Sequence, residues 1–333
     1  MIRFLHEQTA HCESGVVSGL LKYQGLDISE PMAFGLGRGL FFAYAPFIRL
    51  NKLPLVTYRT TPGRLLKQVA TALGLRLETV RFHDAERAML FLDEMVDSGV
   101  PVGLQTGIFW LPYIPRAYRF HFNAHNLIVH GRDGDTYNVS DPVMPFPTTI
   151  SRTDLQVARF AKGALAPKGK LYYFVGDGDT TLLPEAIRAS LIYVAKQMCR
   201  VRFFLIGTRG MRFLAGRMVK WPGKLGDKNA RLHLGQVIRM QEEIGTGGAG
   251  FRLLYAAFLQ ECQGVLDDPY MAEFSERLTL IGDQWRLFAA TAARICKERP
   301  RGDDSFACCA ELICRCADQE ELLFNDILRH LGL

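Results

Sequence analysis

The chain has 333 residues, of which 48% are hydrophobic and 22% charged, and its formal net charge is +6. This length suits two folded domains, and no apolar run reaches the roughly eighteen residues that a membrane span needs, so we expect no membrane partner. Eight cysteines in uneven spacing, with no secretory segment after Met1, indicate a reducing compartment, and we predict a cytoplasmic protein.

The first half of the chain mixes helical and extended patterns. Apolar residues at three- and four-residue intervals predict helices at 12–23, 63–74 and 84–99. Pro62 before the second helix, and Gly74 and Gly99 at the ends of the second and third, are typical start and stop residues. A glycine-rich loop is expected within 34–44, and extended runs are expected at 54–60, 100–106, 125–131, 136–142 and 170–176. The pattern predicts an α+β domain over residues 1–178.

A Gly/Asp cluster followed by Thr and Pro at 176–185 is the clearest domain boundary. Long amphipathic segments without a convincing strand follow, so residues 179–333 are predicted to form an all-α helical domain. Four cysteines near the end match no common zinc spacing, and we interpret them as core residues and predict no metal; they are Cys308, Cys309, Cys314 and Cys316.

Cys12 is the first residue of the first predicted helix. A helix N-terminus presents unpaired N–H groups and the positive end of the helix dipole, and both favour a thiolate. The alternative is a small apolar side chain in the core, which is the commoner role of an arbitrary cysteine. Position alone leaves both interpretations open.

A predicted hairpin supplies a base for this thiol. We expect a strand over 125–130, a five-residue turn over 131–135 and a strand over 136–141, which places His125 directly opposite Asp141. Directly opposed side chains have Cβ atoms about 4.5–5.5 Å apart, so the carboxylate can orient the imidazole. The other two histidines of this segment acquire no carboxylate in that register. A cysteine at a helix start, then histidine and aspartate on neighbouring strands, is the papain-like order of nucleophile, base and orienter.

Five short stretches resemble the butirosin biosynthesis protein H family: "HC" at 11–12 and the segments at 25–44, 125–131, 139–142 and 242–261. The resemblance covers nearly the whole chain. It implies a papain-like cysteine protease fold followed by an accessory helical domain. It also implies an acyltransferase of secondary-metabolite biosynthesis, which takes an acyl group from the phosphopantetheine thioester of an acyl carrier protein and passes it to an amine.

By the same resemblance, Cys12 is the acyl-accepting nucleophile, His125 the base and Asp141 the orienter. Related papain-like enzymes place an oxyanion glutamine six residues before the cysteine. Here that position is His6, whereas Gln8 lies four residues before, so either is a candidate donor. The backbone N–H of Cys12 is a second donor in both cases.

A glycine-rich loop in the second half is a candidate substrate site. Its residues Gly245, Thr246, Gly247 and Gly248 precede a predicted helix, and their amides suit a phosphate or a pantetheine arm. Close packing of two helices explains the glycines equally well. The earlier "GLGRG" at 35–39 lacks the spacing of a dinucleotide fingerprint.

A basic stretch runs from Arg200 to Arg231, with nine Lys or Arg residues against the single acid Asp227. We predict that it docks an acidic acyl carrier protein through Arg212, Arg217 and Lys220. A solvated charged face is the alternative. Nucleic acid is a weaker candidate, because no recognised nucleic-acid motif accompanies the charge.

Three functions remain open at this stage. Acyl transfer to a small amine acceptor leads, a cysteine peptidase or amidase with water as acceptor is second, and a non-catalytic binding module is third. The first two need the same three residues, so the residues alone do not separate them. No cofactor is expected, since phosphopantetheine arrives with the donor, and a homodimer is left undecided.

Overall fold

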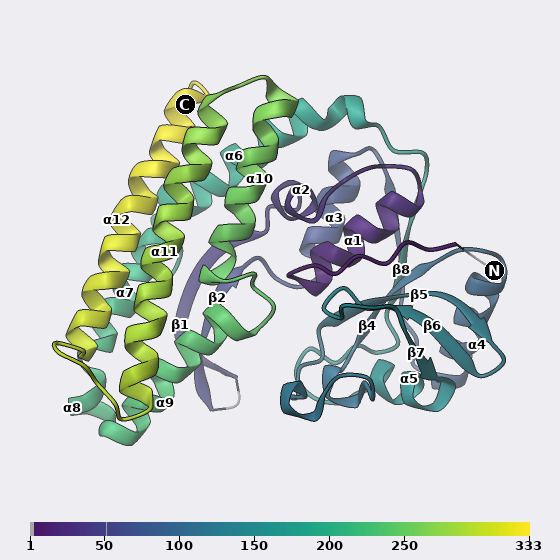
Figure 1. Cartoon of the computed structure of the whole chain (residues 1–333), viewed down its shortest axis with the longest axis horizontal. Coiled ribbons are helices and arrows are strands. Elements are labelled where there is room, and N and C mark those ends of the chain that lie inside the picture. The colour runs from purple at the N-terminus through teal and green to yellow at the C-terminus, as the bar shows by residue number, and fades with distance from the viewer. Residues whose placement is uncertain (1–2, 51) are drawn as a thin grey trace. The chain divides into compact units, whose positions relative to one another are not determined.

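The structure, a computed structural model, describes residues 3–50 and 52–333 and consists of two compact units (Figure 1). Unit 1 comprises the chain up to Ala33 together with residues 62–182, and unit 2 comprises residues 34–61 and 183–333. The division at residue 182 lies close to the predicted one at 178. The transfer of residues 34–61 to the helical unit differs from the prediction of one continuous domain over 1–178.

Unit 1 is built on a single six-stranded sheet in the order β3-β8-β4-β5-β6-β7, in which every neighbouring pair is antiparallel. The strands are β3 (Arg76–Val80), β4 (Val102–Thr106), β5 (His125–Asp133), β6 (Thr136–Ser140), β7 (Thr148–Ser151) and β8 (Leu171–Val175). The helices are α1 (Cys12–Tyr23), α3 (Arg64–Ala72), α4 (Ala85–Asp97) and α5 (Arg152–Arg159), with α2 (Glu30–Leu36) passing into unit 2. Short 3-10 turns cover Ile108–Trp110, Arg116–Tyr118 and Thr180–Leu182.

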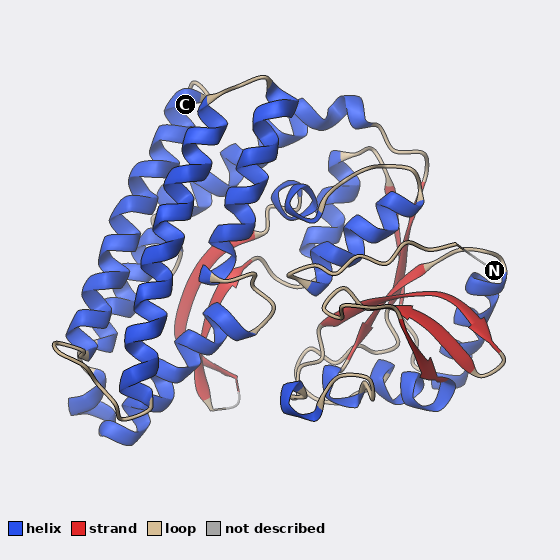
Figure 2. Cartoon of the chain, viewed as in Figure 1, coloured by secondary structure: helices blue, strands red, loops and turns tan. Residues whose placement is uncertain are grey.

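Helices cover both faces of this sheet (Figure 2). Leu127 and Val129 of β5 are fully buried in the cluster that includes Leu92 of α4 and Leu155 of α5. The alternate residue Ile128 points the other way, toward Gly19 of α1. Because both faces of β5 are buried here, Leu127, Ile128 and Val129 form a continuous apolar run rather than an alternating one.

The β5–β6 hairpin does not have the predicted register. Gly134 takes a φ of 54°, which permits a tight two-residue turn, so β5 continues to Asp133 and pairs with Thr136. A β-bulge then lies between the Val129–Val139 pair and the Gly131–Asn138 pair. Continued past β6, this register places Asp141 opposite Leu127. The prediction that Asp141 lies directly opposite His125 is therefore wrong.

Unit 2 is helical apart from one hairpin, within the part of the chain that the structure describes. Its helices are α6 (Leu183–Cys199), α7 (Gly207–Met218), α8 (Trp221–Leu225), α9 (Asp227–Ile238), α10 (Arg252–Leu266), α11 (Tyr270–Cys296) and α12 (Phe306–His330). A π-helical turn, Arg239–Glu243, and a 3-10 turn, Ala249–Phe251, join α9 to α10. The long helices α10, α11 and α12 run alongside one another (Figure 1).

The hairpin of unit 2 consists of β1 (Leu40–Leu50) and β2 (Leu53–Arg59). Its buried aromatic rings explain why it belongs with the helices. The ring centroids of Phe42 and Tyr58 lie 6.3 Å and 5.6 Å from that of Trp285 in α11. The sequence pattern predicts a loop within 34–44 and indicates neither β1 nor these long-range contacts, so that prediction is wrong for residues 40–44.

A buried ion pair lies beside the same tryptophan. Arg252 donates from Nε and Nη2 to the two carboxylate oxygens of Glu320, both at 2.9 Å, and Trp285 Nε1 donates to Glu320 at 2.7 Å. Both charged side chains have no solvent exposure.

Among the described residues, no helix is long and apolar enough to cross a membrane.

Candidate active site

Cys12 begins α1, as predicted, and the loop before it is held in place by one carboxylate. Glu30 accepts hydrogen bonds from the N–H groups of Ala10 and His11 at 2.9 and 2.7 Å and from Ser14 Oγ at 3.0 Å. His11 is the N-cap, and its side chain accepts from the N–H of Ser14. Burial raises the pKa of Glu30, and these three hydrogen bonds oppose the rise. The thiol therefore sits at a helix start with a fixed backbone.

Asp141 is the most firmly held residue of the site. Its Oδ2 lies 2.7 Å from His125 Nε2 and accepts from the Tyr113 hydroxyl at 2.8 Å, while Oδ1 accepts from the N–H of Val143 at 3.2 Å. The carboxylate has no solvent exposure. Both of its oxygens thus have partners, and its orientation is fixed from three directions.

Cys12 lies beside His125, close enough to contribute to the pKa of its ring. Because Nε2 of His125 faces Asp141, Nδ1 is the ring nitrogen left for the thiol. Burial lowers the pKa of His125, but the charge and hydrogen bond of Asp141, with a further contribution from Cys12, outweigh it and raise that pKa above its usual value. The structure thus brings Cys12, His125 and Asp141 together, although the predicted register was wrong.

The bulge at His130 explains how Asp141 reaches His125. Without it, the pairing of Asp133 with Thr136 would continue to place Asp141 opposite Ile128, on the face of the sheet away from His125. The extra residue places Asp141 opposite Leu127, which shares a face with His125. The two side chains are then diagonal neighbours, with Cα atoms about 7–8 Å apart, a separation that they can bridge.

His6 ties the N-terminal segment to the loop that carries Asp141. Its Nδ1 lies 2.8 Å from Ser140 Oγ and its Nε2 lies 3.0 Å from the carbonyl oxygen of Met144. Both ring nitrogens are engaged, so His6 is not free to serve as an oxyanion donor. Gln8 is exposed, and together with the backbone N–H of Cys12 it remains the predicted donor.

Other histidines of the segment lie elsewhere. The ring of His121 stacks on Phe109 with centroids 4.1 Å apart, and that of His130 stacks on Phe4 at 5.1 Å. Neither takes the place of His125 beside the thiol.

Sequence reasoning missed three polar residues at the site. Tyr113 bonds Asp141, as described above. Asn126 directs its Nδ2 at the sulfur of Cys12 at 3.9 Å, and Tyr172 donates its hydroxyl to Asn126 Oδ1 at 2.8 Å. The signal for Asn126 is an amide directly after His125 and directly before the buried apolar run of Leu127, Ile128 and Val129. The two tyrosines have no comparable signal in the sequence.

The predicted substrate loop has a structural explanation instead. Thr246 is buried and donates to the carbonyl oxygen of Gln241 at 2.6 Å, and the N–H of Gly248 donates to the Thr246 hydroxyl at 3.1 Å. The next amide, of Ala249, donates to the carboxylate of Glu242 at 3.2 Å. Two amides that a phosphate would need are occupied, and a carboxylate lies beside them. We therefore assign the segment Gly245, Thr246, Gly247 and Gly248 to packing and do not retain it as a binding site.

Acids from outside the basic stretch neutralise part of it. Arg212 donates to Asp318 of α12 at 2.7 Å and also pairs with Glu321, and Arg231 pairs with Glu298. Asp227 is the single acid within the stretch, but α12 and the segment just after α11 supply further acids to Arg212 and Arg231, which the local sequence does not show. Lys220 is exposed and Arg217 half-buried, so both stay candidates for docking.

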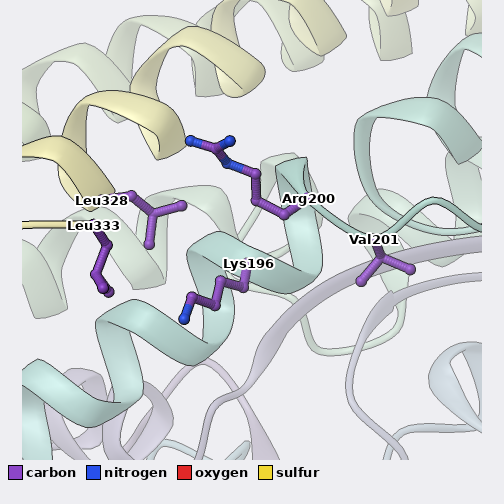
Figure 3. A pocket seen from close by; sticks show the side chains of 5 residues that line it. All are labelled: Lys196, Arg200, Val201, Leu328 and Leu333. Carbon is purple, nitrogen blue, oxygen red and sulfur yellow. The ribbon is translucent and has the colours of Figure 1, made fainter.

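An open hollow of about 430 Å³ lies between the C-terminal ends of α6 and α12 (Figure 3). It is lined by Lys196, Arg200, Val201, Leu328 and Leu333.

Among residues 3–50 and 52–333, no group of three His, Cys, Asp or Glu side chains is placed to hold a metal ion. Cys309 and Cys316 are fully buried on α12, as core residues are.

A helix that begins with cysteine, packed on an antiparallel sheet that carries histidine and then aspartate, is the papain-like arrangement. The class that this fold indicates is a papain-like cysteine enzyme. The profile described as "Butirosin biosynthesis protein H, N-terminal" matches residues 11–142, and that of a domain of unknown function, DUF4872, matches residues 153–327, just over half of the chain. The chain belongs to the butirosin biosynthesis protein H-like family.

No curated protein matches this chain in sequence. A crystal structure described as that of a C39-like peptidase from Bacillus anthracis is 15% identical, with 53% of this chain and 94% of that chain covered and a TM-score of 0.35.

Proposed function

We propose that this protein is a cysteine-dependent acyltransferase of secondary-metabolite biosynthesis, which moves an acyl group from a phosphopantetheine thioester to an amine. The observation that supports it most is the connected set Cys12–His125–Asp141, with the 2.7 Å contact between His125 Nε2 and Asp141. Family membership favours a biosynthetic transfer over digestion of proteins.

The chemistry has two balanced steps. In the first, the sulfur of Cys12 forms a bond to the thioester carbonyl carbon, its proton passes to His125 Nδ1, and the pantetheine sulfur leaves with that proton. In the second, the acceptor amine forms a bond to the same carbon, the bond to Cys12 breaks, and the proton lost by the amine returns through His125 to the cysteine. Asp141 keeps Nε2 protonated throughout, so that Nδ1 faces the sulfur. The N–H of Cys12 and the side chain of Gln8 are the proposed oxyanion donors.

Intact-protein mass spectrometry tests the first step. After incubation with acyl-pantetheine or acyl-carrier thioesters, we expect a mass increase equal to one acyl group, which Cys12→Ala abolishes. Cys308→Ala is the matched control, because Cys308 is a half-buried thiol on α12, and it should keep the adduct. No adduct on the unchanged protein, or an adduct that survives Cys12→Ala, contradicts the proposal.

The second step separates the transferase from its alternative, a cysteine peptidase or amidase. Cys12 is only 8% exposed, which limits access of water to an acyl-enzyme. Adding small amines, aminoglycosides among them, should discharge the adduct as an amide much faster than buffer alone. Equal discharge in both would favour the hydrolase, and failure of every acyl or peptide substrate would favour a binding module.

For the donor, we propose an acidic acyl carrier protein that docks at the basic surface of unit 2. With Arg212 paired to Asp318, the candidate contacts are Lys220 and Arg217. Lys220→Glu should raise the KM for a carrier-bound thioester, and added salt should weaken binding, because a charge-steered encounter is screened over about 8–10 Å. Turnover of a free pantetheine thioester should not change. If Lys220→Glu leaves both substrates unaffected, this surface is a solvated face.

A further inference from the structure

The side-chain amide of Asn126 is directed at the sulfur of Cys12, with Nδ2 and Sγ 3.9 Å apart. It lies one residue after His125, at the start of β5, and is only 4% exposed. Tyr172 of the neighbouring part of the sheet is fully buried and donates to Asn126 Oδ1 at 2.8 Å. A polar amide at this depth is costly unless each of its groups has a partner.

The surroundings determine which way this amide points. One atom of the Asn126 amide lies 3.0 Å from the carbonyl oxygen of Ala124. A carbonyl oxygen only accepts hydrogen bonds, so the atom beside it must be the NH₂ group and not Oδ1. The Tyr172 hydroxyl then donates to Oδ1, as found. Of the two NH₂ hydrogens, one goes to Ala124, and the other is left for the sulfur of Cys12 at 3.9 Å.

We propose that Asn126 is a catalytic residue that stabilises the thiolate of Cys12, and that Tyr172 is a positioning residue that fixes the Asn126 amide. An N–H donor favours the anion over the thiol, because thiolate sulfur is a stronger acceptor than thiol sulfur, and a dry surrounding strengthens the contact. This inference rests on the proposed role of Cys12 as the nucleophile. It adds an amide donor to the sulfur, supplied by the residue that follows His125 on β5.

Several ionisable groups surround the sulfur and bear on any measurement of its titration. They are His125 and Asp141, Tyr172 and Lys170 at β8, Glu13 and His11 at the start of α1, Glu30 of α2, and Lys67 of α3, which lies near Lys170. A change at Asn126 leaves all of them in place. A difference between the unchanged protein and an Asn126 variant therefore reports the amide.

The test is the rate of alkylation of Cys12 by iodoacetamide as a function of pH, followed by peptide mass spectrometry. Asn126→Ala should slow alkylation near neutral pH about tenfold or more and shift its rise to higher pH, because a hydrogen bond to a charged group is lost. Tyr172→Phe should shift the profile in the same direction by a smaller factor, about two- to fivefold, since Ala124 still holds the amide.

Asn123→Ala is the matched control. Asn123 is also a buried asparagine whose Nδ2 donates to two carbonyl oxygens, those of Lys162 and Ala164, and it has no hydrogen bond to Cys12 among those described. It should lower the melting temperature about as much as Asn126→Ala and leave the alkylation profile unchanged. A profile that moves equally in both variants would mean that Asn126 acts only through stability, and would overturn the proposal.

Three further outcomes separate this inference from the proposed function. If both Asn126→Ala and Tyr172→Phe fold and alkylate like the unchanged protein, the thiolate role is refuted, even where the acyl adduct still forms on Cys12. If Asn126→Ala alkylates normally but transfers acyl groups slowly, the amide serves the oxyanion instead, and the proposal is again overturned. If alkylation depends on Asn126 while no thioester acylates Cys12, the inference stands and the proposed substrate class fails.

Discussion

Replacing Asp141 with asparagine tests the whole chain of contacts from the sheet to the thiol. Asp141 Oδ2 serves both His125 and Tyr113, and Oδ1 serves the N–H of Val143. Asparagine has one oxygen for these three donors. If that oxygen faces His125, the NH₂ group opposes the N–H of Val143. If the NH₂ group faces His125, Nε2 must lose its proton, and the proton then sits on Nδ1 facing Cys12, where it blocks proton acceptance.

The expected loss follows from these two arrangements. A hydrogen bond to a charged group contributes about 1.5–3 kcal/mol, which corresponds to about 10- to 150-fold in rate, and the wrong imidazole tautomer costs up to about 10⁴-fold. We therefore expect Asp141→Asn to slow acylation of Cys12 by at least about tenfold and by up to about 10⁴-fold. Tyr113→Phe keeps the carboxylate and is the control, with a loss of no more than about tenfold.

The effect of Asp141→Asn on the unfolding free energy should depend on pH, in a direction that follows from the pKa of His125. Asp141 raises the pKa of His125, so protonation of His125 stabilises the folded protein below its unfolded-state pKa of about 6.5, and this stabilisation is lost as the pH rises into the alkaline range. The difference in unfolding free energy between the unchanged protein and Asp141→Asn should be largest at or below about pH 6.5 and should shrink at alkaline pH. Denaturant unfolding at several pH values measures it. An unchanged acylation rate, with a difference in stability that grows with pH, would refute the assignment.

Three other predictions follow from the same structure. Iodoacetamide at neutral pH should label Cys12 first, because burial raises the pKa of six other cysteines, namely Cys199, Cys262, Cys296, Cys309, Cys314 and Cys316. Faster labelling of any of these six would count against Cys12 as the nucleophile. Gly15→Ala should lower activity, since an added Cβ would lie 2.6 Å from Pro142 Cβ and 2.1 Å from Thr9 Oγ1, whereas Gly216→Ala, with open space around it, should not. Glu320→Gln should destabilise unit 2 by about 3–5 kcal/mol in denaturant unfolding, because it leaves the buried Arg252 charge unpaired, and a loss below about 1 kcal/mol would contradict that reasoning.

Much of unit 1 was predictable because its signals are local. The periodicity at 12–23 and the glycines after the next two helices gave α1, α3 and α4 close to their observed bounds. The runs that became β4, β5, β6 and β8 were also found. The strands β3 and β7 and the helices α2 and α5 were missed, since strands of four or five residues and helices of seven or eight carry little periodic signal.

The contact between His125 and Asp141 was predicted for a reason that proved wrong. The assumed five-residue turn and the observed combination of a two-residue turn with a bulge both place the two residues on the same face of the sheet. A tight turn alone would have placed them on opposite faces. The ring of His130, the residue at the bulge, stacks on Phe4, and no local sequence pattern marks the bulge. The prediction that both side chains lie on one face of the sheet was therefore right by chance. The predicted separation of two directly opposed residues was wrong, because they are diagonal neighbours.

Long-range contacts account for the remaining differences. The hairpin β1–β2 belongs with α11 because Phe42 and Tyr58 pack against Trp285. Each of the two lies more than two hundred residues before Trp285 in the chain. The partner of Arg212 lies on α12, 106 residues away along the chain. Neither fact has a local signature, and for that reason the domain limits and the docking surface were the weakest of the sequence-based expectations.

The substitution of histidine for the usual glutamine at position 6 acquires a physical meaning from these contacts. His6 bonds Ser140 and Met144 on either side of Asp141, and the N–H of Thr9 donates to Pro142 at 2.7 Å between them. The segment that leads into Cys12 is thereby fastened along the segment that carries Asp141. The ring of His125 lies between Cys12 and Asp141. Because the two segments are joined, the distance between Cys12 and Asp141 that this ring spans is fixed. His6 thus positions Cys12 relative to Asp141, and the oxyanion donor of the proposed reaction has to come from elsewhere in the loop.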